Sequence, residues 1–111
     1  MKTFDRNPYL KQSTIISMVQ RWIIIHSIIY YELNSSLVSD QQFDRICRHL
    51  VDLKEESPQD YKNSQYYYCM NDFDGTTGFY LYSRLRGRDR DYLLHLAQSV
   101  IRLAKGDRKC I

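Results

Sequence analysis

The spacing of hydrophobic residues predicts a long helix near the start of the chain. Residues 15–29 present a broad apolar surface that is rich in isoleucine and broken by a polar stripe. Isoleucine favours strands, but the length of the run and the stripe predict a helix from Ser13 or Thr14 to Leu33, with Ser13 as its N-cap. The polar interruptions, which include His26, argue against a membrane span. We interpret His26 as a structural histidine whose hydrogen bonds are satisfied.

A second amphipathic helix is predicted after a short loop. Ser39 and Gln42 have the spacing of a capping box, and Asp40 lies where the positive end of a helix favours an anion. We expect this helix to end near Glu56, before the Ser-Pro pair at Pro58. Its apolar positions repeat at helical spacing: Phe43, Ile46, Cys47, Leu50 and Val51.

The third segment has the pattern of a β-hairpin. Two aromatic, β-prone runs, at 65–73 and 76–85, flank the Asp74-Gly75 pair. Aromatic residues are enriched in strands, and an Asp-Gly pair between two such runs is typical of a hairpin turn. The sequence therefore predicts a β-hairpin here.

A final helix is predicted near the C-terminus, with Asp89 as its N-cap, Lys105 as its last residue and Gly106 as a left-handed C-cap. The predicted fold class is α+β: an N-terminal helical hairpin, a β-hairpin and a closing helix in one domain. The expected divisions are an N-terminal arm at 1–12, the domain at 13–106 and a C-terminal tail at 107–111.

The size and composition of the chain limit its function. The 111 residues are 43% hydrophobic and 26% charged, as in an ordinary folded domain. One module of this size is too small for a barrel enzyme or for a two-half dinucleotide-binding fold. Ten residues are tyrosine, a side chain that suits interfaces and stacking on bases as well as the rim of a small core.

Charge is unevenly distributed along the chain. Residues 1–31 carry a net charge of +3, residues 32–74 of −5 and residues 75–111 of +5. Such a division is typical of a chain that meets a polyanion at one end, or of two faces that pair with each other.

The three cysteines, Cys47, Cys69 and Cys110, are odd in number and lack the spacing of metal ligands. We expect no metal site, and we expect Cys110 to be the exposed thiol. The chain shows no secretory signal at its start, so a reducing, cytoplasmic location is expected.

The strongest functional pattern lies where the first predicted helix ends and the second begins. Tyr30 and Tyr31 precede the loop, and Asp40 and Asp44 lie four residues apart, on one face of the next helix. Aromatic rings and carboxylates that meet there would suit a flat ligand that is cationic or rich in hydroxyl groups. The alternative is that the tyrosines only pack and that Asp40 only caps its helix.

This pattern resembles the small N-terminal domain Ia of bacterial NAD-dependent DNA ligases, over residues 24–56. The family pattern has a Tyr-Tyr or Tyr-His pair, then Asp-x-Pro, then Ile-Ser-Asp-x-x-Tyr-Asp. Here Asn34 and Ser36 replace the family's aspartate and proline, and Phe43 replaces the tyrosine of the last motif. The resemblance implies a helical domain that closes over the nicotinamide mononucleotide (NMN) half of NAD. The implied ligand-binding residues are Tyr30, Tyr31, Asp40, Phe43 and Asp44.

Two enzymatic interpretations of residues 72–76 are not favoured. A ligase needs a separate adenylation domain with a Lys-x-Asp-Gly nucleophile, and Asp72 occupies the lysine position here. The same residues resemble the Asp-x-Asp-Gly-Thr motif of haloacid-dehalogenase-type phosphatases. That chemistry needs a parallel α/β sheet, for which the remaining chain is too short. We therefore expect no catalytic residues and no required cofactor, with NMN or NAD as the candidate ligand.

A protein partner is the second hypothesis. A stand-alone relative of a ligase subdomain resembles the small phage proteins that act as inhibitors or adaptors of host nucleic-acid enzymes, CRISPR effectors among them. The acidic middle of the chain could imitate DNA, and the predicted hairpin offers anchors. Nucleic-acid binding by the arginines after the hairpin is an alternative that we do not favour. The expected partner-binding residues are Tyr66, Tyr67, Tyr68, Asp72, Asp74, Tyr80, Tyr82, Arg84, Arg86 and Arg88.

Overall fold

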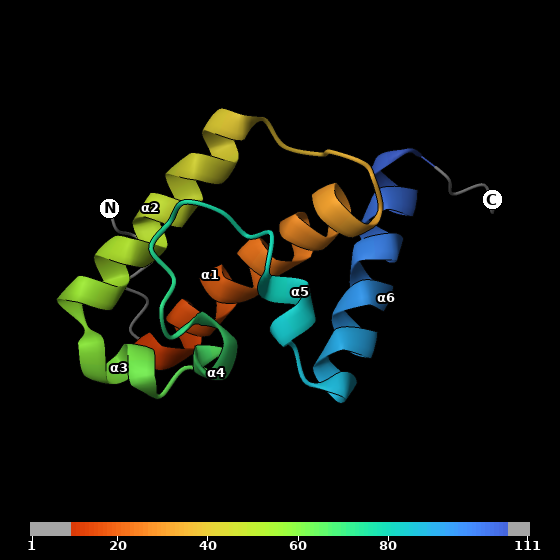
Figure 1. Cartoon of the computed structure of the whole chain (residues 1–111). Helices are drawn as coiled ribbons and strands as arrows, with labels where there is room; N and C mark the ends of the chain where they lie inside the picture. The colour runs from red at the N-terminus through yellow and green to blue at the C-terminus, as the bar shows by residue number, and fades with distance from the viewer. Residues whose placement is uncertain (1–9, 107–111) are drawn as a thin grey trace.

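The computed structural model describes residues 10–106, of which 71% are helical. Helix α1 (Gln12–Ser27) runs through the middle of the molecule and continues as the π-helix η2 (Ile28–Glu32). In Figure 1, α2 and α6 lie on opposite sides of α1, and the shorter helices α3, α4 and α5 complete the bundle. The predicted tail at 107–111 and most of the predicted arm lie outside the described residues.

The isoleucine-rich run is the centre of the hydrophobic core. Six of its isoleucines are at most 1% exposed: Ile15, Ile16, Ile23, Ile24, Ile28 and Ile29. Neighbouring helices cover α1 from several sides, which is why β-branched residues are tolerated in it despite their preference for strands. The predicted helix is confirmed, although its N-cap is Lys11 rather than Ser13. None of the helices described could cross a membrane, because none is both long and apolar enough.

Two polar residues of α1, Ser17 and Gln20, are buried and make specific hydrogen bonds. Gln20 donates from Nε2 to Ser64 Oγ at 2.9 Å and accepts from the Tyr66 amide at 3.2 Å. The Gln65 amide donates to Ser17 Oγ at 2.8 Å. These bonds satisfy polar groups that would otherwise be costly to bury, and they attach residues 64–66 to the central helix.

Helix α2 (Asp40–Glu56) begins and ends where the sequence predicts. Ser39 Oγ accepts from the Gln42 amide at 3.1 Å, and Gln42 Oε1 accepts from the Ser39 amide at 2.9 Å. The capping box is therefore confirmed. A short helix, α3 (Pro58–Lys62), follows. Its proline occupies the first turn, where the lack of an amide hydrogen costs nothing.

The predicted α+β fold is wrong, because no strand occurs within residues 10–106. In place of the hairpin are two short helices, α4 (Tyr67–Met70) and α5 (Leu81–Arg84), joined by an irregular segment. Buried residues recur three and four positions apart, at Tyr66, Cys69, Met70 and Phe73, which is helical spacing. The strand preference of tyrosine concealed this period.

Helix α6 (Gly87–Ala104) closes the bundle and begins earlier than predicted. Its N-cap is Arg86, so the prediction of Asp89 as the cap is wrong. Asp89 instead accepts a hydrogen bond from the Tyr68 hydroxyl, which ties α6 to α4. The C-terminal prediction is better: Lys105 is the C-cap, and Gly106 follows in the left-handed region at φ +70°.

Candidate ligand-binding site

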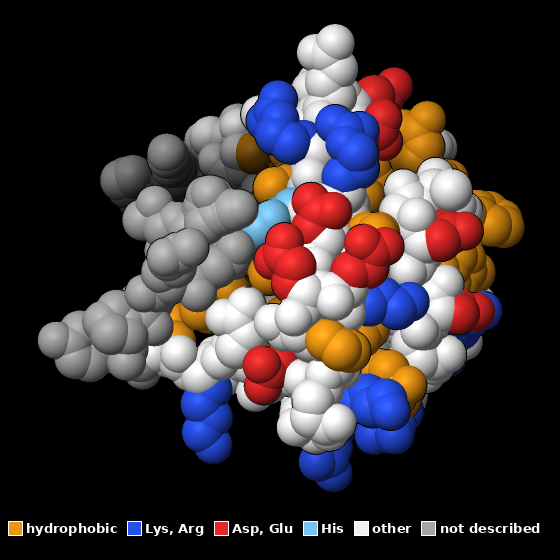
Figure 2. Space-filling view, turned by 90° about the vertical axis from the view of Figure 1, so that its left-hand side faces the viewer, with side chains coloured by type: hydrophobic (Ala, Val, Ile, Leu, Met, Phe, Trp, Pro, Cys, Tyr) orange, Lys and Arg blue, Asp and Glu red, His pale blue; other side chains and the backbone are white. Residues whose placement is uncertain are grey.

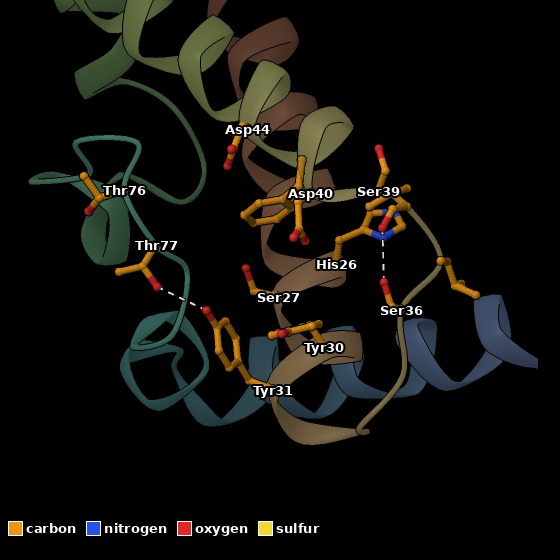
Figure 3. Close-up of a pocket in the computed structure, with 13 residues that line it drawn as sticks. His26, Ser27, Tyr30, Tyr31, Ser36, Ser39, Asp40, Asp44, Thr76 and Thr77 are labelled. Carbon is orange, nitrogen blue, oxygen red and sulfur yellow. Dashed lines mark hydrogen bonds between the residues drawn. The ribbon is translucent and has the colours of Figure 1, made fainter.

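A pocket of about 260 Å³ lies where η2, the following loop and the start of α2 meet residues 76–77. Figure 3 shows side chains from these separate segments directed toward one space. The pocket is lined by His26, Ser27, Tyr30, Tyr31, Ser36, Leu37, Val38, Ser39, Asp40, Phe43, Asp44, Thr76 and Thr77.

All five residues predicted to bind a ligand line this pocket: Tyr30, Tyr31, Asp40, Phe43 and Asp44. The tyrosines come from η2 and the other three residues from the first turns of α2. The sequence prediction missed His26 and Ser27, although they lie four residues before Tyr30 and Tyr31, on the same side of a helix. It also missed Thr76 and Thr77, which no local pattern connects to the two helices.

The π-helix η2 determines how the two tyrosines leave the core. Its wider turn ends with the Leu33 amide donating to the Ile28 carbonyl at 3.0 Å, and Asn34 follows with φ at +55°. Single π-helical turns inside longer helices are rare and recur at functional sites. Here the turn leaves Tyr30 and Tyr31 exposed, directly after the buried pair at 28–29.

Tyr31 connects the mouth of the pocket to the segment between α4 and α5. Its hydroxyl lies 3.3 Å from Thr77 Oγ1, within hydrogen-bond distance. Its ring packs edge-on against Tyr30 at 4.9 Å and against Phe79 at 5.2 Å. Such T-shaped pairs hold aromatic rings in a defined orientation.

Two lining rings, Phe43 and His26, pack against Trp22, which is not itself among the lining residues. The Trp22 ring lies 6.1 Å from Phe43 and 4.3 Å from His26. The interpretation of His26 as a satisfied structural histidine is wrong: its Nδ1 is buried and has no hydrogen-bond partner among the residues described. Burial lowers the pKa of His26 below its ordinary value of 6.5, so the ring is neutral at pH 7.

Ser27 places a second unpartnered polar atom at the pocket. The residue is 3% exposed, and in the part of the chain that the structure describes its Oγ has no hydrogen-bond partner. Serine in a helix often donates to the carbonyl four residues earlier, as Ser17 does toward Ser13. Gly78 packs directly over Ser27, and a β-carbon at Gly78 would lie 2.0 Å from Ser27 Oγ. Only glycine permits this close approach.

Asp40 and Asp44 supply the charge of the pocket. They lie one turn apart on α2, and both are exposed. Among the residues described, neither has an ion-pair partner. By contrast, the exposed carboxylate of Asp72 accepts from Arg84 at 2.7 Å. Asp40 and Asp44 therefore remain available to a ligand.

The carboxylates at 72 and 74 have local structural partners. Arg84 bonds Asp72 and lowers its pKa. Asp74 Oδ1 accepts from the Thr76 amide at 3.0 Å and from Thr76 Oγ1 at 2.7 Å, which also lowers the pKa of that carboxyl. Within residues 10–106 no group of three or more His, Cys, Asp or Glu could hold a metal ion. This arrangement explains the Asp-Phe-Asp-Gly-Thr string as a turn.

Of the five predicted partner-binding tyrosines, one is buried and four are half-buried against the core. Tyr66 is 1% exposed and cannot provide a contact surface. Tyr67 packs edge-on against Tyr61 at 5.9 Å, and the remaining three rings carry arginines. Arg86 stacks on Tyr68 at 3.9 Å, Arg84 on Tyr80 at 4.2 Å and Arg90 on Tyr82 at 5.6 Å.

Three of the four arginines at 84–90 therefore support the fold. Besides stacking on Tyr82, Arg90 donates to the Leu85 carbonyl at 2.9 Å. Arg88 is exposed. Because three of these guanidinium groups already cover tyrosine faces, few of them are free to follow a phosphate backbone.

The two described cysteines are unsuited to nucleophilic chemistry. Cys47 and Cys69 are free and buried. Burial raises the pKa of the Cys47 thiol to about 12 and that of Cys69 to about 11. Because the thiolate is the reactive form, both thiols are inert at neutral pH. The prediction for Cys110 falls outside the described residues.

Comparison of the chain with protein families, with characterised proteins and with solved structures gives no match. The resemblance to ligase domain Ia therefore remains a prediction, and the geometry of the pocket is the basis for assigning a ligand.

Proposed function

We propose that this chain is a non-enzymatic, intracellular binding protein that holds the nicotinamide half of a nucleotide in the pocket between η2 and α2. One observation carries the proposal: the five residues implied by the ligase-like pattern all line one cavity. Tyrosine and phenylalanine rings offer stacking surfaces, and the carboxylates of Asp40 and Asp44 can accept hydrogen bonds from ribose hydroxyls.

The size of the cavity favours a mononucleotide over a dinucleotide. Pockets that enclose drug-sized ligands have volumes of roughly 300–1,000 Å³, and this pocket has about 260 Å³. It would therefore hold the nicotinamide and ribose of NMN, whereas the adenosine half of NAD would extend beyond this pocket.

Calorimetric titration of the chain with NMN and with NAD tests this proposal. We expect binding of both ligands, and a loss of about tenfold or more in affinity for Tyr30→Ala and for Asp44→Ala, in the range of a removed hot spot. Tyr92→Ala and Asp52→Ala are matched controls, because both residues are exposed and neither lines the pocket. Absence of both heat and a shift in melting temperature at millimolar ligand would overturn the proposal.

A second candidate function is inhibition or recruitment of a host nucleic-acid enzyme. The observation that favours it is an exposed aromatic cluster at the mouth of the pocket, where Phe79 is 67% exposed and contacts Tyr31. Exposed aromatic side chains are frequent anchors of protein interfaces. Phe79→Ala should abolish retention of a partner in a pull-down, and Tyr92→Ala should not.

The acidic middle of the chain gives this second candidate less support. Figure 2 views the molecule from the side of α2 and α3, where Lys and Arg side chains lie among the Asp and Glu side chains. A mixed surface of this kind lacks the single-sign field that imitation of DNA requires.

A further inference from the structure

The charge of the pocket has one sign. Asp40 and Asp44 give it a formal charge of −2, and no Lys or Arg is among its described lining residues. His26, which faces the pocket from α1, is kept neutral by burial. The loop and the segment at 76–77 contribute only uncharged side chains. An anionic group placed inside would meet two carboxylates and no counter-charge.

The aromatic walls favour the opposite charge. Tyr30, Tyr31 and Phe43 line the same cavity as the two carboxylates. The face of an aromatic ring carries partial negative charge and attracts cations, more strongly where water is excluded. Rings and carboxylates together therefore favour a flat cation over a neutral or anionic molecule.

Ser27 provides an independent indication that a ligand belongs here. The residue is only 3% exposed, and its hydroxyl is buried and has no hydrogen-bond partner within residues 10–106. Figure 3 shows this hydroxyl directed into the space beside Asp40 and Thr77. A buried hydroxyl without a hydrogen bond is costly, and a ligand with an amide or hydroxyl group would satisfy it.

We propose that the pocket selects a cationic aromatic nucleoside that bears no phosphate, so that a pyridinium riboside binds more tightly than its 5′-phosphate. This inference rests on the proposed function and specifies its ligand. The pyridinium ring lies among the aromatic side chains near Asp40 and Asp44, and Ser27 bonds a polar group of the ligand. A phosphate on the ribose is disfavoured by repulsion from both carboxylates.

Calorimetry with three ligands at low ionic strength tests the inference. Nicotinamide riboside carries the cationic ring, NMN adds a phosphate, and dihydronicotinamide riboside has a neutral ring of similar size. We expect the riboside to bind about tenfold more tightly than either of the other two, a modest penalty for unfavourable charge. Added salt should reduce the difference in affinity between the riboside and NMN, because it screens exposed charges.

The outcomes separate this inference from the function on which it rests. If NMN binds as tightly as the riboside or more tightly, the charge selection is wrong and the nucleotide-binding function stands. Equal binding of the oxidised and reduced ribosides would also overturn it. If none of the three ligands binds, both proposals fail.

Charge-neutral variants identify the residues responsible. Asp40→Asn and Asp44→Asn keep the shape of the side chain and should each reduce the preference for the riboside over NMN, whereas Asp52→Asn on the same helix should leave it unchanged. Ser27→Ala should weaken the binding of all three ligands to a similar extent. An unchanged preference in both aspartate variants would contradict the assignment. The melting temperature of each variant verifies that it is folded.

Discussion

The chain has two tyrosine-rich segments, one at 30–31 and a second at 66–82. Tyr30 and Tyr31, at the end of the central helix, are 55% and 40% exposed, whereas Tyr66 in the second segment is 1% exposed. In the second segment the polar groups also find partners: the Tyr68 hydroxyl donates to Asp89, and Arg86 covers the Tyr68 ring. The two segments are alike in residue type, but the pocket brings exposed rings and two carboxylates without ion-pair partners, among the residues described, next to the buried hydroxyl of Ser27.

The comparison shows that tyrosine content alone does not identify a binding surface. A side chain whose hydrogen bonds and faces are satisfied inside the protein contributes to folding. A buried polar atom without a partner, such as Ser27 Oγ, costs stability, and a bound ligand can offset that cost. The pocket is therefore expected to respond to ligand, and the second segment to affect stability.

The largest expected effect comes from removing a ring of the second segment. Tyr66→Ala should lower the free energy of unfolding by about 3–5 kcal/mol, the usual cost of truncating a buried aromatic side chain. Tyr30→Ala should change stability far less and act on ligand binding instead. Urea unfolding of both variants, with Tyr92→Ala as an exposed control, measures the difference. Comparable losses for Tyr66→Ala and Tyr30→Ala would remove the distinction between the two segments.

A smaller effect is expected where the two segments touch. Gly78→Ala introduces a β-carbon 2.0 Å from Ser27 Oγ, and overpacking of this kind costs about 1–3 kcal/mol. Ser27→Ala in the same chain should restore part of that stability, because it removes the clashing oxygen. The double-mutant cycle measures this coupling. Strict additivity of the two changes would mean that Gly78 does not press on Ser27.

The smallest expected effect is a pH dependence that originates at the pocket. Because burial lowers the pKa of His26, the unfolded chain takes up a proton there more readily than the folded chain. Its contribution to stability is therefore complete above the unfolded pKa of about 6.5 and decreases as the pH falls below it. Urea unfolding measures the free energy of unfolding at pH 7.5 and at pH 5.5. The decrease between these two pH values should be smaller for His26→Gln than for the unchanged chain. An identical loss in both proteins would contradict this role for His26.

Local sequence patterns predicted the parts of the site that depend on neighbouring residues. The capping box fixes the start of α2, and helical spacing then places Asp40 and Asp44 on one face. The adjacent pair of tyrosines ends a helix whose apolar residues required burial. Each of these features needs only a few consecutive residues, so the sequence was sufficient.

The β-hairpin prediction failed because two preferences competed. Tyrosine and the Asp-Gly pair favour a hairpin, yet the side chains at 66, 69, 70 and 73 are buried together against α1 and its neighbours. The hydrogen bonds from residues 64–66 to the central helix favour the compact helical path. Tertiary burial outweighed a local preference of about 1 kcal/mol or less per residue.

The sequence by itself determined a helical N-terminal half, the capped start of α2 and the set of five side chains around one junction. Only the tertiary structure decided that Thr76 and Thr77 complete the pocket, and that Ser27 Oγ and His26 Nδ1 have no hydrogen-bond partner within residues 10–106. The physical reason is distance along the chain. Gly78 approaches Ser27 closely only after the segment between α4 and α5 folds back over α1. No local pattern in α1 or in that segment predicts this contact.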